Sequence, residues 1–228
     1  VSAAPRDDAA LRARLLAEGR LAPGADGEVE LTALLDTLAA KAWIWREWAQ
    51  GPARSRAFAL DLGDVVLTGE LDNIHDTGLL QFSASRGHGK TRLGLDVDAL
   101  VWAALGGPRP SPRLLRGGGA EELPPLPVAA AKAGLRALVD LHLGAQATLL
   151  PFMPKTAYAL VAAEREGKHG GSAAEKEWKK RGGHGEGESD SVQLAMRGRD
   201  PFDDSAPGAA QAFREAAFAV FDALAGKP

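Results

Sequence analysis

The sequence contains no cysteine among its 228 residues. Disulfide bonds and thiolate metal sites are therefore excluded, and a reducing cytoplasm is the compartment that this composition favours. Aromatic residues make up only 6%, with a single tyrosine. No apolar run is long enough to span a bilayer, and we find no signal peptide. The sequence therefore predicts a cytoplasmic protein that does not enter a membrane.

An excess of charge of either sign is also missing. The chain has 27 basic and 30 acidic residues, which gives a formal net charge of -3. This balance argues against a protein that coats nucleic acid, although it leaves room for a local basic strip. The chain begins at Val1 and not at a methionine, so we expect a piece of a longer polypeptide or a processed terminus.

Apolar periodicity predicts helices at both ends of the chain and strands between them. Residues 6–19 form one amphipathic pattern, and a second begins at Thr32 and runs to about Gln50. Residues 57–96 contain short runs rich in Val, Leu and Ile that are broken by Gly, Asp and Asn. These runs predict an antiparallel meander of about four strands, the last being "TRLGLDV".

The second half of the chain is predicted to be mainly helical. Helices are expected at 97–105, at 127–144, after the prolines of "LLPFMP", and at 207–225. In the last of these, one stripe is apolar and contains Phe213, Ala217, Val220, Phe221 and Leu224. The Gly- and Pro-rich stretch 106–126 predicts a long loop with room for one strand.

A polar, glycine-rich stretch at 165–190 predicts a mobile segment with one or two helical turns around 173–181. We find no internal repeat and no heptad array. We therefore expect one α/β domain over 1–228, in which helices flank a mixed sheet with a meander and a C-terminal helical annex follows.

The stretch "ASRGHGKT" at 84–91 nearly matches a phosphate-binding P-loop. The motif requires a glycine where Ala84 stands, and it requires a helix to begin at the Lys-Thr pair. Because a strand-like run follows here, we predict a hairpin tip, with ATP binding as a remote alternative. Arg86, Lys90 and Arg92 could make this tip a basic finger that contacts a DNA backbone. The other interpretation is a solvated hairpin tip.

The stretch "GELDNIHDTGLLQFSAS" at 69–85 has the layout of a metal-dependent nuclease core. Such a core holds Mg²⁺ with at least two converging acids and usually a lysine. Asp72 is well placed on its strand, but Gln81 and Ser83 stand where the second acid and the lysine are needed. Both are neutral, so the sequence predicts that the site is degenerate and holds no metal or other cofactor.

A rearranged Mg²⁺ nuclease site is the alternative. Glu70 and Asp72 point to the same face of one strand, because side chains alternate with a period of two. The simpler interpretation is that these acids lie on a solvated strand edge. The five histidines are scattered and do not pair at metal-ligand spacing.

The chain resembles the C-terminal domain of the exodeoxyribonuclease V gamma subunit, the RecC family. The resemblance rests on "LTGELDNIHDTGLLQFSAS" (67–85), "LLPFMPKTAYAL" (149–160) and "KEWKK…GESDSVQLAMRGRDPFDD" (176–204). It implies a C-terminal fragment with a PD-(D/E)xK nuclease-like core that is catalytically inactive. In active relatives a G-x-x-D strand precedes an acid-x-lysine strand. Gly69 and Asp72 fit the first half, and Gln81 and Ser83 depart from the second.

The resemblance also implies a role and partners. The family's gamma subunit lies between the two motor subunits of a helicase–nuclease that repairs double-strand breaks, and it helps to split and guide DNA. The implied partners are the alpha and beta subunits and, weakly for the isolated domain, DNA. Trp43 lies opposite the apolar stripe of its helix and Phe218 lies off the stripe of the last helix, so we predict that both belong to a partner interface. Burial by other parts of the chain is the alternative.

Overall fold

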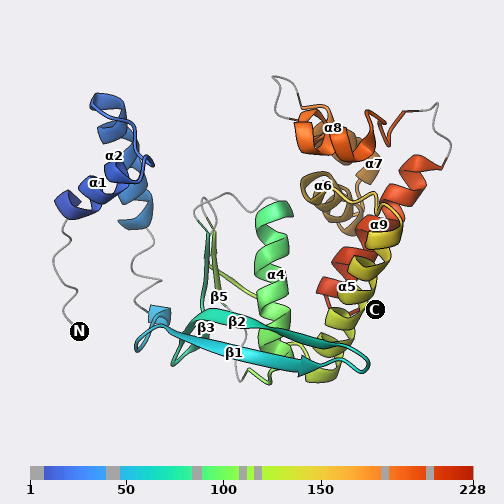
Figure 1. Cartoon of the computed structure of the whole chain (residues 1–228), viewed down its shortest axis with the longest axis horizontal. Helices are drawn as coiled ribbons and strands as arrows, with labels where there is room; N and C mark the ends of the chain where they lie inside the picture. The colour runs from blue at the N-terminus through green and yellow to red at the C-terminus, as the bar shows by residue number, and fades with distance from the viewer. Residues whose placement is uncertain are drawn as a thin grey trace. The chain divides into compact units, whose positions relative to one another are not determined.

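The computed structural model describes residues 8–39, 47–83, 89–107, 112–115, 120–180, 185–203 and 208–227. The chain forms two compact units, Val1–Trp48 and Ala49–Pro228 (Figure 1). The prediction of one domain over 1–228 did not include this division. No described helix combines the length and the apolar character needed to cross a membrane.

The described part of the first unit includes the short helices α1 (Asp8–Ala17) and α2 (Ala25–Ala39). An ion pair between Arg12 and Glu28 joins them. The second helix begins seven residues before the predicted Thr32. Asp26 and Glu28 lie in its first turn, where negative charge is favourable to the helix dipole. Trp43 lies outside the described residues.

The described residues of the second unit include two small three-stranded sheets. In the first, β1 (Arg54–Asp61), β2 (Val66–His75) and β3 (Gly78–Leu79) form an antiparallel meander. In the second, β4 (Gln81–Ser83) is parallel to β5 (Pro112–Leu115), and β6 (Ala120–Glu122) is antiparallel to β5. Only Leu80 separates β3 from β4, so one extended run takes part in both sheets. The meander is present, but the predicted single mixed sheet is divided.

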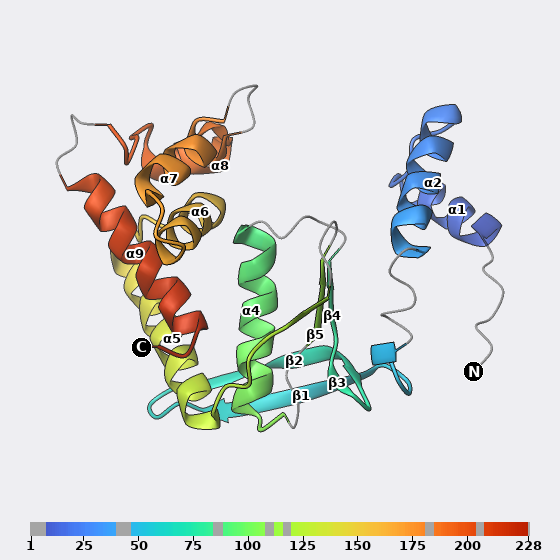
Figure 2. The same ribbon diagram turned by 180° about the vertical axis from the view of Figure 1, so that it is seen from behind.

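The prediction of a fourth meander strand is wrong, because its residues lie in the first half of a helix. Helix α4 spans Gly89–Ala104 and includes all of "TRLGLDV". Over seven residues this run alternates like a strand, but over the whole element the apolar residues recur at helical spacing. Since β4, α4 and β5 follow one another with the strands parallel, they form a βαβ crossover (Figure 2).

Four further α-helices longer than eight residues follow: α5 (Val128–Ala147), α6 (Pro154–Arg165), α7 (Gly170–Trp178) and α9 (Ala209–Leu224). Between the last two lie the 3₁₀ turn η1 (Glu186–Glu188) and the short helix α8 (Asp190–Met196). The 165–190 segment thus contains a nine-residue helix that ends in the buried Trp178. Its mobility stays a prediction.

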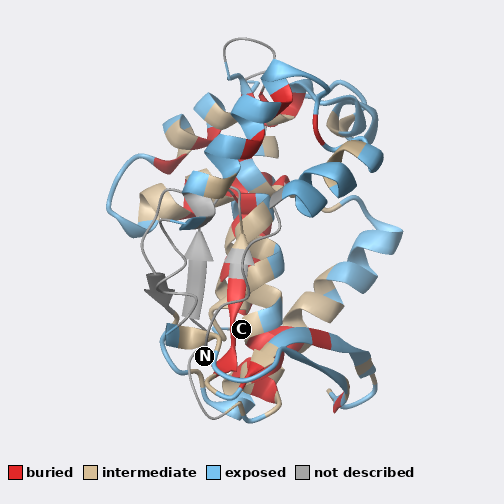
Figure 3. Cartoon of the chain, turned by 90° about the vertical axis from the view of Figure 1, so that its left-hand side faces the viewer, coloured by how far each residue is buried: buried red, intermediate tan, exposed pale blue. Residues whose placement is uncertain are grey.

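Two apolar cores hold the second unit together. The first joins the meander to α4 and α5 and includes Leu71, Leu100 and Leu135. The second joins α6, α7 and α9 around Phe213, whose side chain is fully buried. Figure 3 shows the buried residues gathered where these elements meet. The predicted stripe on the last helix faces this second core.

Candidate functional site

Asp72 lies at an irregularity of the meander. Arg56 pairs with Leu71 and Arg54 pairs with Ile74, so two residues of β2 oppose the single Ser55. Asn73 has a φ of 59° there, a left-handed conformation that asparagine adopts more readily than most residues. The exposed Asp72 carboxylate accepts a hydrogen bond from the Ser55 hydroxyl. Its described hydrogen bond is therefore to β1.

Gln81, in contrast, is buried and links strand β4 to helix α4 by a hydrogen bond. The residue is only 3% exposed. Its side-chain amide nitrogen donates a hydrogen bond to the Leu95 carbonyl of α4. A carboxylate could not make this contact, because an ionised acid has no proton to donate. The amide thus donates to a carbonyl of α4, and Gln81 is the residue that the sequence analysis compares with the second acid of a nuclease core. Ser83 is half-buried at the end of β4.

The acids around the meander are dispersed and not convergent. Glu70 is exposed on β2 opposite Ala57. Asp64 pairs with Arg136 and Asp76 pairs with Arg54. Among the described residues, no three His, Cys, Asp or Glu side chains lie together as a metal site would require. The rearranged Glu70 and Asp72 site therefore gains no third ligand from this part of the chain.

Two of the three basic residues predicted for the hairpin tip lie on a helix. Lys90 and Thr91 lie in the first turn of α4, so the helix that a P-loop requires is present, contrary to our prediction. Arg86 and the rest of 84–88 lie outside the described residues, and Ala84 still replaces the glycine of the motif. Lys90 is exposed, whereas Arg92 is half-buried with its guanidinium 5.4 Å from the centre of the Tyr158 ring. Lys90 and Arg92 thus lie on a helix and not on a hairpin tip, and contact with DNA stays a prediction.

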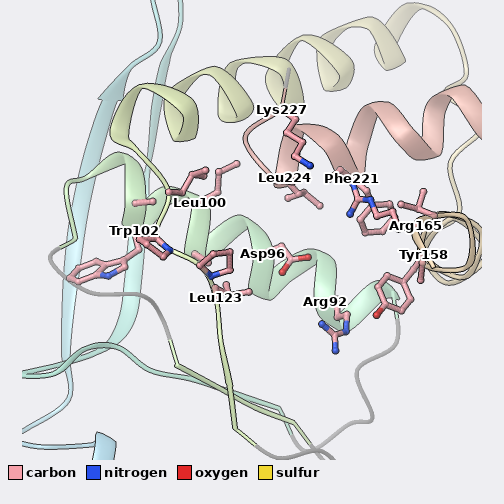
Figure 4. A pocket seen from close by; sticks show the side chains of 18 of the residues that line it. Arg92, Asp96, Leu100, Trp102, Leu123, Tyr158, Arg165, Phe221, Leu224 and Lys227 are labelled. Atoms are coloured by element: carbon pink, nitrogen blue, oxygen red, sulfur yellow. Dashed lines mark hydrogen bonds between the residues drawn. The ribbon is translucent and has the colours of Figure 1, made fainter. Parts of the chain in front are cut away.

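A cavity of about 660 Å³ lies beside Arg92. Its walls come from α4, from residues 123–126, from α6 and from the C-terminal end of α9. The lining is mainly apolar, with Leu100, Trp102, Val161 and Phe221 below a charged rim. Figure 4 shows Trp102 at one end of the cavity and Arg92 with Tyr158 at the other. The sequence pattern hides this site because it predicts a strand for Arg92 and Asp96, whereas on a helix the two residues are one turn apart.

The motif "LLPFMPKTAYAL" contains the start of helix α6. Pro154 begins α6, and the Glu186 carboxylate accepts hydrogen bonds from the backbone N–H groups of Lys155 and Thr156, at 3.1 and 2.7 Å. A carboxylate is well suited to the N-terminus of a helix, which carries unpaired N–H groups and partial positive charge. Two of the stretches that carry the family resemblance are thus joined by one side chain, and its role is structural.

Electrostatic contacts support the same helical annex. The Arg214 guanidinium of α9 donates hydrogen bonds to the Glu164 carboxylate of α6, with Nη2 2.6 Å from Oε2. This contact holds the pKa of Glu164 below its ordinary value, against the opposing effect of desolvation. The Arg214 guanidinium also lies 4.9 Å from the centre of the Phe218 ring. Phe218 is half-buried against the second core, so part of this predicted interface residue is covered by its own chain.

Together these features define an α/β protein in which a meander passes into a βαβ crossover and then into a helical annex, with no cluster of metal ligands among the described residues. The family described as the RecC C-terminal domain matches residues 2–165, and the chain belongs to this family. Membership supports a role in DNA repair as part of a RecBCD subunit. Comparison with curated proteins gives no match.

Proposed function

We propose that this chain is a non-catalytic domain of a cytoplasmic RecBCD-type helicase–nuclease, which contacts the alpha and beta subunits and guides the DNA strands as they separate. The observation that carries the proposal is the hydrogen bond from Gln81 to the Leu95 carbonyl. This hydrogen bond links β4 to α4 through the residue that stands where an active nuclease would have a metal ligand. A scaffold that serves assembly can keep such a tie, whereas a metal-dependent nuclease cannot.

The order of the elements supports a PD-(D/E)xK nuclease-like core as the origin of this domain. An antiparallel meander is followed by α4 and then by β5, which is parallel to β4. Gly69 and Asp72 lie on β2, and Gln81 and Ser83 lie on β4, which is the strand order that the active relatives use. A shared fold does not carry the chemistry with it, because function depends on the residues of the site.

Reconstitution with the partner subunits tests the proposal. The alpha and beta subunits are purified and mixed with a gamma subunit that contains this chain or its Asp72→Ala variant. We expect both gamma subunits to assemble equally and to give complexes with equal nuclease activity, because the reaction takes place in another subunit. A complex that assembles but loses its nuclease activity in the Asp72→Ala variant would contradict the proposal.

DNA contact by the isolated chain is expected to be weak. The net charge of -3 gives little attraction to a phosphate backbone, and binding that depends on lysine and arginine falls steeply with salt. We expect Arg86→Ala, Lys90→Ala and Arg92→Ala together to remove most of the binding to a labelled duplex at low salt. Tight binding at physiological salt that survives this triple change would contradict a contact through these residues.

A further inference from the structure

The cavity between α4, α6 and α9 has the size and lining of a ligand site. Its volume of about 660 Å³ lies within the usual range for such sites. Leu100 and Val161 are each 2% exposed and Phe221 is 5% exposed, so the floor is formed by side chains that belong to the two cores. The packing of the cores therefore fixes the shape of the floor, and the half-buried Leu123, Leu126 and Leu224 add apolar surface that an occupant can cover.

The charges at the rim favour an occupant with a negative group. Arg165 forms an ion pair with Asp222, with Nη2 2.7 Å from Oδ1. Glu166 forms an ion pair with Lys168, with Oε2 2.5 Å from Nζ. Arg92 and Asp96 are oppositely charged and lie one turn apart on α4, so they offset each other. Lys227 remains, and its exposed ammonium has no ion-pair partner within the described part of the chain. The local balance is therefore positive.

The length of the cavity favours a chain segment over a compact small molecule. Its lining on α4 extends from Arg92 to Ala103, which corresponds to about 16 Å along the helix axis. An extended peptide advances about 3.3 Å per residue, so about five residues span the same length. Residues 123–126, with two prolines that have no backbone N–H, form the side opposite α6 (Figure 4).

We propose that this cavity binds a short extended segment of a partner subunit. An apolar side chain of that segment lies over Leu100 and Phe221, and a neighbouring carboxylate pairs with Lys227. The proposal rests on the assembly role proposed above and adds the place and the chemistry of one contact. Burial of an apolar anchor supplies most of the affinity, and the exposed ion pair contributes mainly to the choice of partner.

Filling the cavity tests whether it binds an apolar anion. The probe is 8-anilinonaphthalene-1-sulfonate, titrated into the whole chain and followed by fluorescence. Ala99→Trp and Ala162→Trp place an indole in the cavity from α4 and α6, and Ala212→Trp on the exposed face of α9 is the matched control. We expect saturable binding that weakens about tenfold in each filled variant and is unchanged in the control. Equal binding by all four proteins, each with an unchanged melting transition, would overturn the site.

A charge reversal tests the role of Lys227. Lys227→Glu should weaken binding of the same probe by about twofold to fivefold, as expected for an exposed ion pair. Lys176→Glu makes the same change in net charge at an exposed position of α7 away from the cavity. Equal effects of the two reversals would overturn the assigned carboxylate contact, because net charge alone would then explain them.

Assembly with the purified alpha and beta subunits tests the nature of the occupant. The filled variants should weaken assembly about tenfold, and the Ala212→Trp control should assemble like wild type. If the wild-type gamma subunit fails to assemble, the proposed function itself is wrong. If it assembles and the filled variants assemble equally well, the function stands and the partner segment is overturned, even where the probe shows that the cavity binds a small apolar anion.

Discussion

Among single side chains, Glu186 makes the contact with the clearest energetic consequence. Its carboxylate accepts hydrogen bonds from two backbone N–H groups at the start of α6. Glu186→Ala should lower the free energy of unfolding by about 1.5–3 kcal/mol, because hydrogen bonds to a charged group are lost. Glu175→Ala, which removes only a surface pair with Lys179, should cost about 0.5 kcal/mol or less. Urea unfolding measures both, and equal losses would contradict the role of Glu186.

The ion pair between Glu164 and Arg214 predicts a specific pH dependence. Since the folded-state pKa of Glu164 is lowered, its contribution is present above the ordinary glutamate pKa of about 4.3 and is lost as the pH falls through the folded-state value. Glu164→Gln should therefore destabilise the chain at pH 7 by about 0.2–1 kcal/mol, and the difference from wild type should vanish in acid. Unfolding curves between pH 3 and pH 7 measure this, and a difference that grows in acid would contradict it.

Among helices and strands, the contact between α4 and α6 depends on a glycine. A Cβ atom at Gly89 would lie 1.9 Å from the Pro154 carbonyl oxygen, whereas a Cβ at Gly94 on the same helix would meet nothing within 4 Å. Gly89→Ala should destabilise the chain by about 1–3 kcal/mol through steric conflict. Gly94→Ala should instead stabilise it by roughly 0.5–1 kcal/mol, because alanine favours a helix. Thermal unfolding measures both changes, and the same sign for both would contradict this packing.

How far the sequence predicts an element depends on the length of its pattern. The stripe from Phe213 to Leu224 repeats over more than three turns, and the predicted helix 207–225 differs from α9 by no more than two residues at either end. The run at 91–97 is too short to separate a period of two from a period of 3.6, so the first half of α4 was assigned to a strand. For the same reason the sequence predicts a hairpin tip for Lys90 and Arg92, which lie on α4.

The candidate site was predictable only in part, for a related reason. The neutral character of Gln81 and Ser83 is visible in the sequence and already excludes an acid–lysine pair. The partner of Gln81 is not visible, because the Leu95 carbonyl comes within reach only when α4 folds back along β4. The cavity is hidden in the same way, since its lining comes from four separate segments between Arg92 and Lys227.

For the whole chain, the family match ends within the set of elements that form the second core, because α6 lies inside the match and α7 and α9 lie beyond it. The match ends at residue 165, but α6 packs against Trp178, Phe213 and Phe221 from beyond that point. A fragment of residues 1–165 should therefore lose its cooperative unfolding transition, because the apolar face of α6 is left in water. A fragment of residues 49–228 keeps both cores of the second unit and should unfold cooperatively. Circular dichroism during heating compares the two, and a cooperative transition for 1–165 would contradict the account.

The function proposed above requires that this domain does no nuclease chemistry of its own. The most direct measurement is cleavage of labelled single-stranded and duplex DNA by the isolated chain in Mg²⁺ or Mn²⁺, beside its Asp72→Ala variant. We predict that neither protein cuts either substrate, because Gln81 is committed to the Leu95 carbonyl and Asp72 to Ser55. Residual cleavage that is equal in the two proteins would come from a contaminating enzyme. Cleavage by the wild-type chain that disappears in Asp72→Ala would contradict the claim.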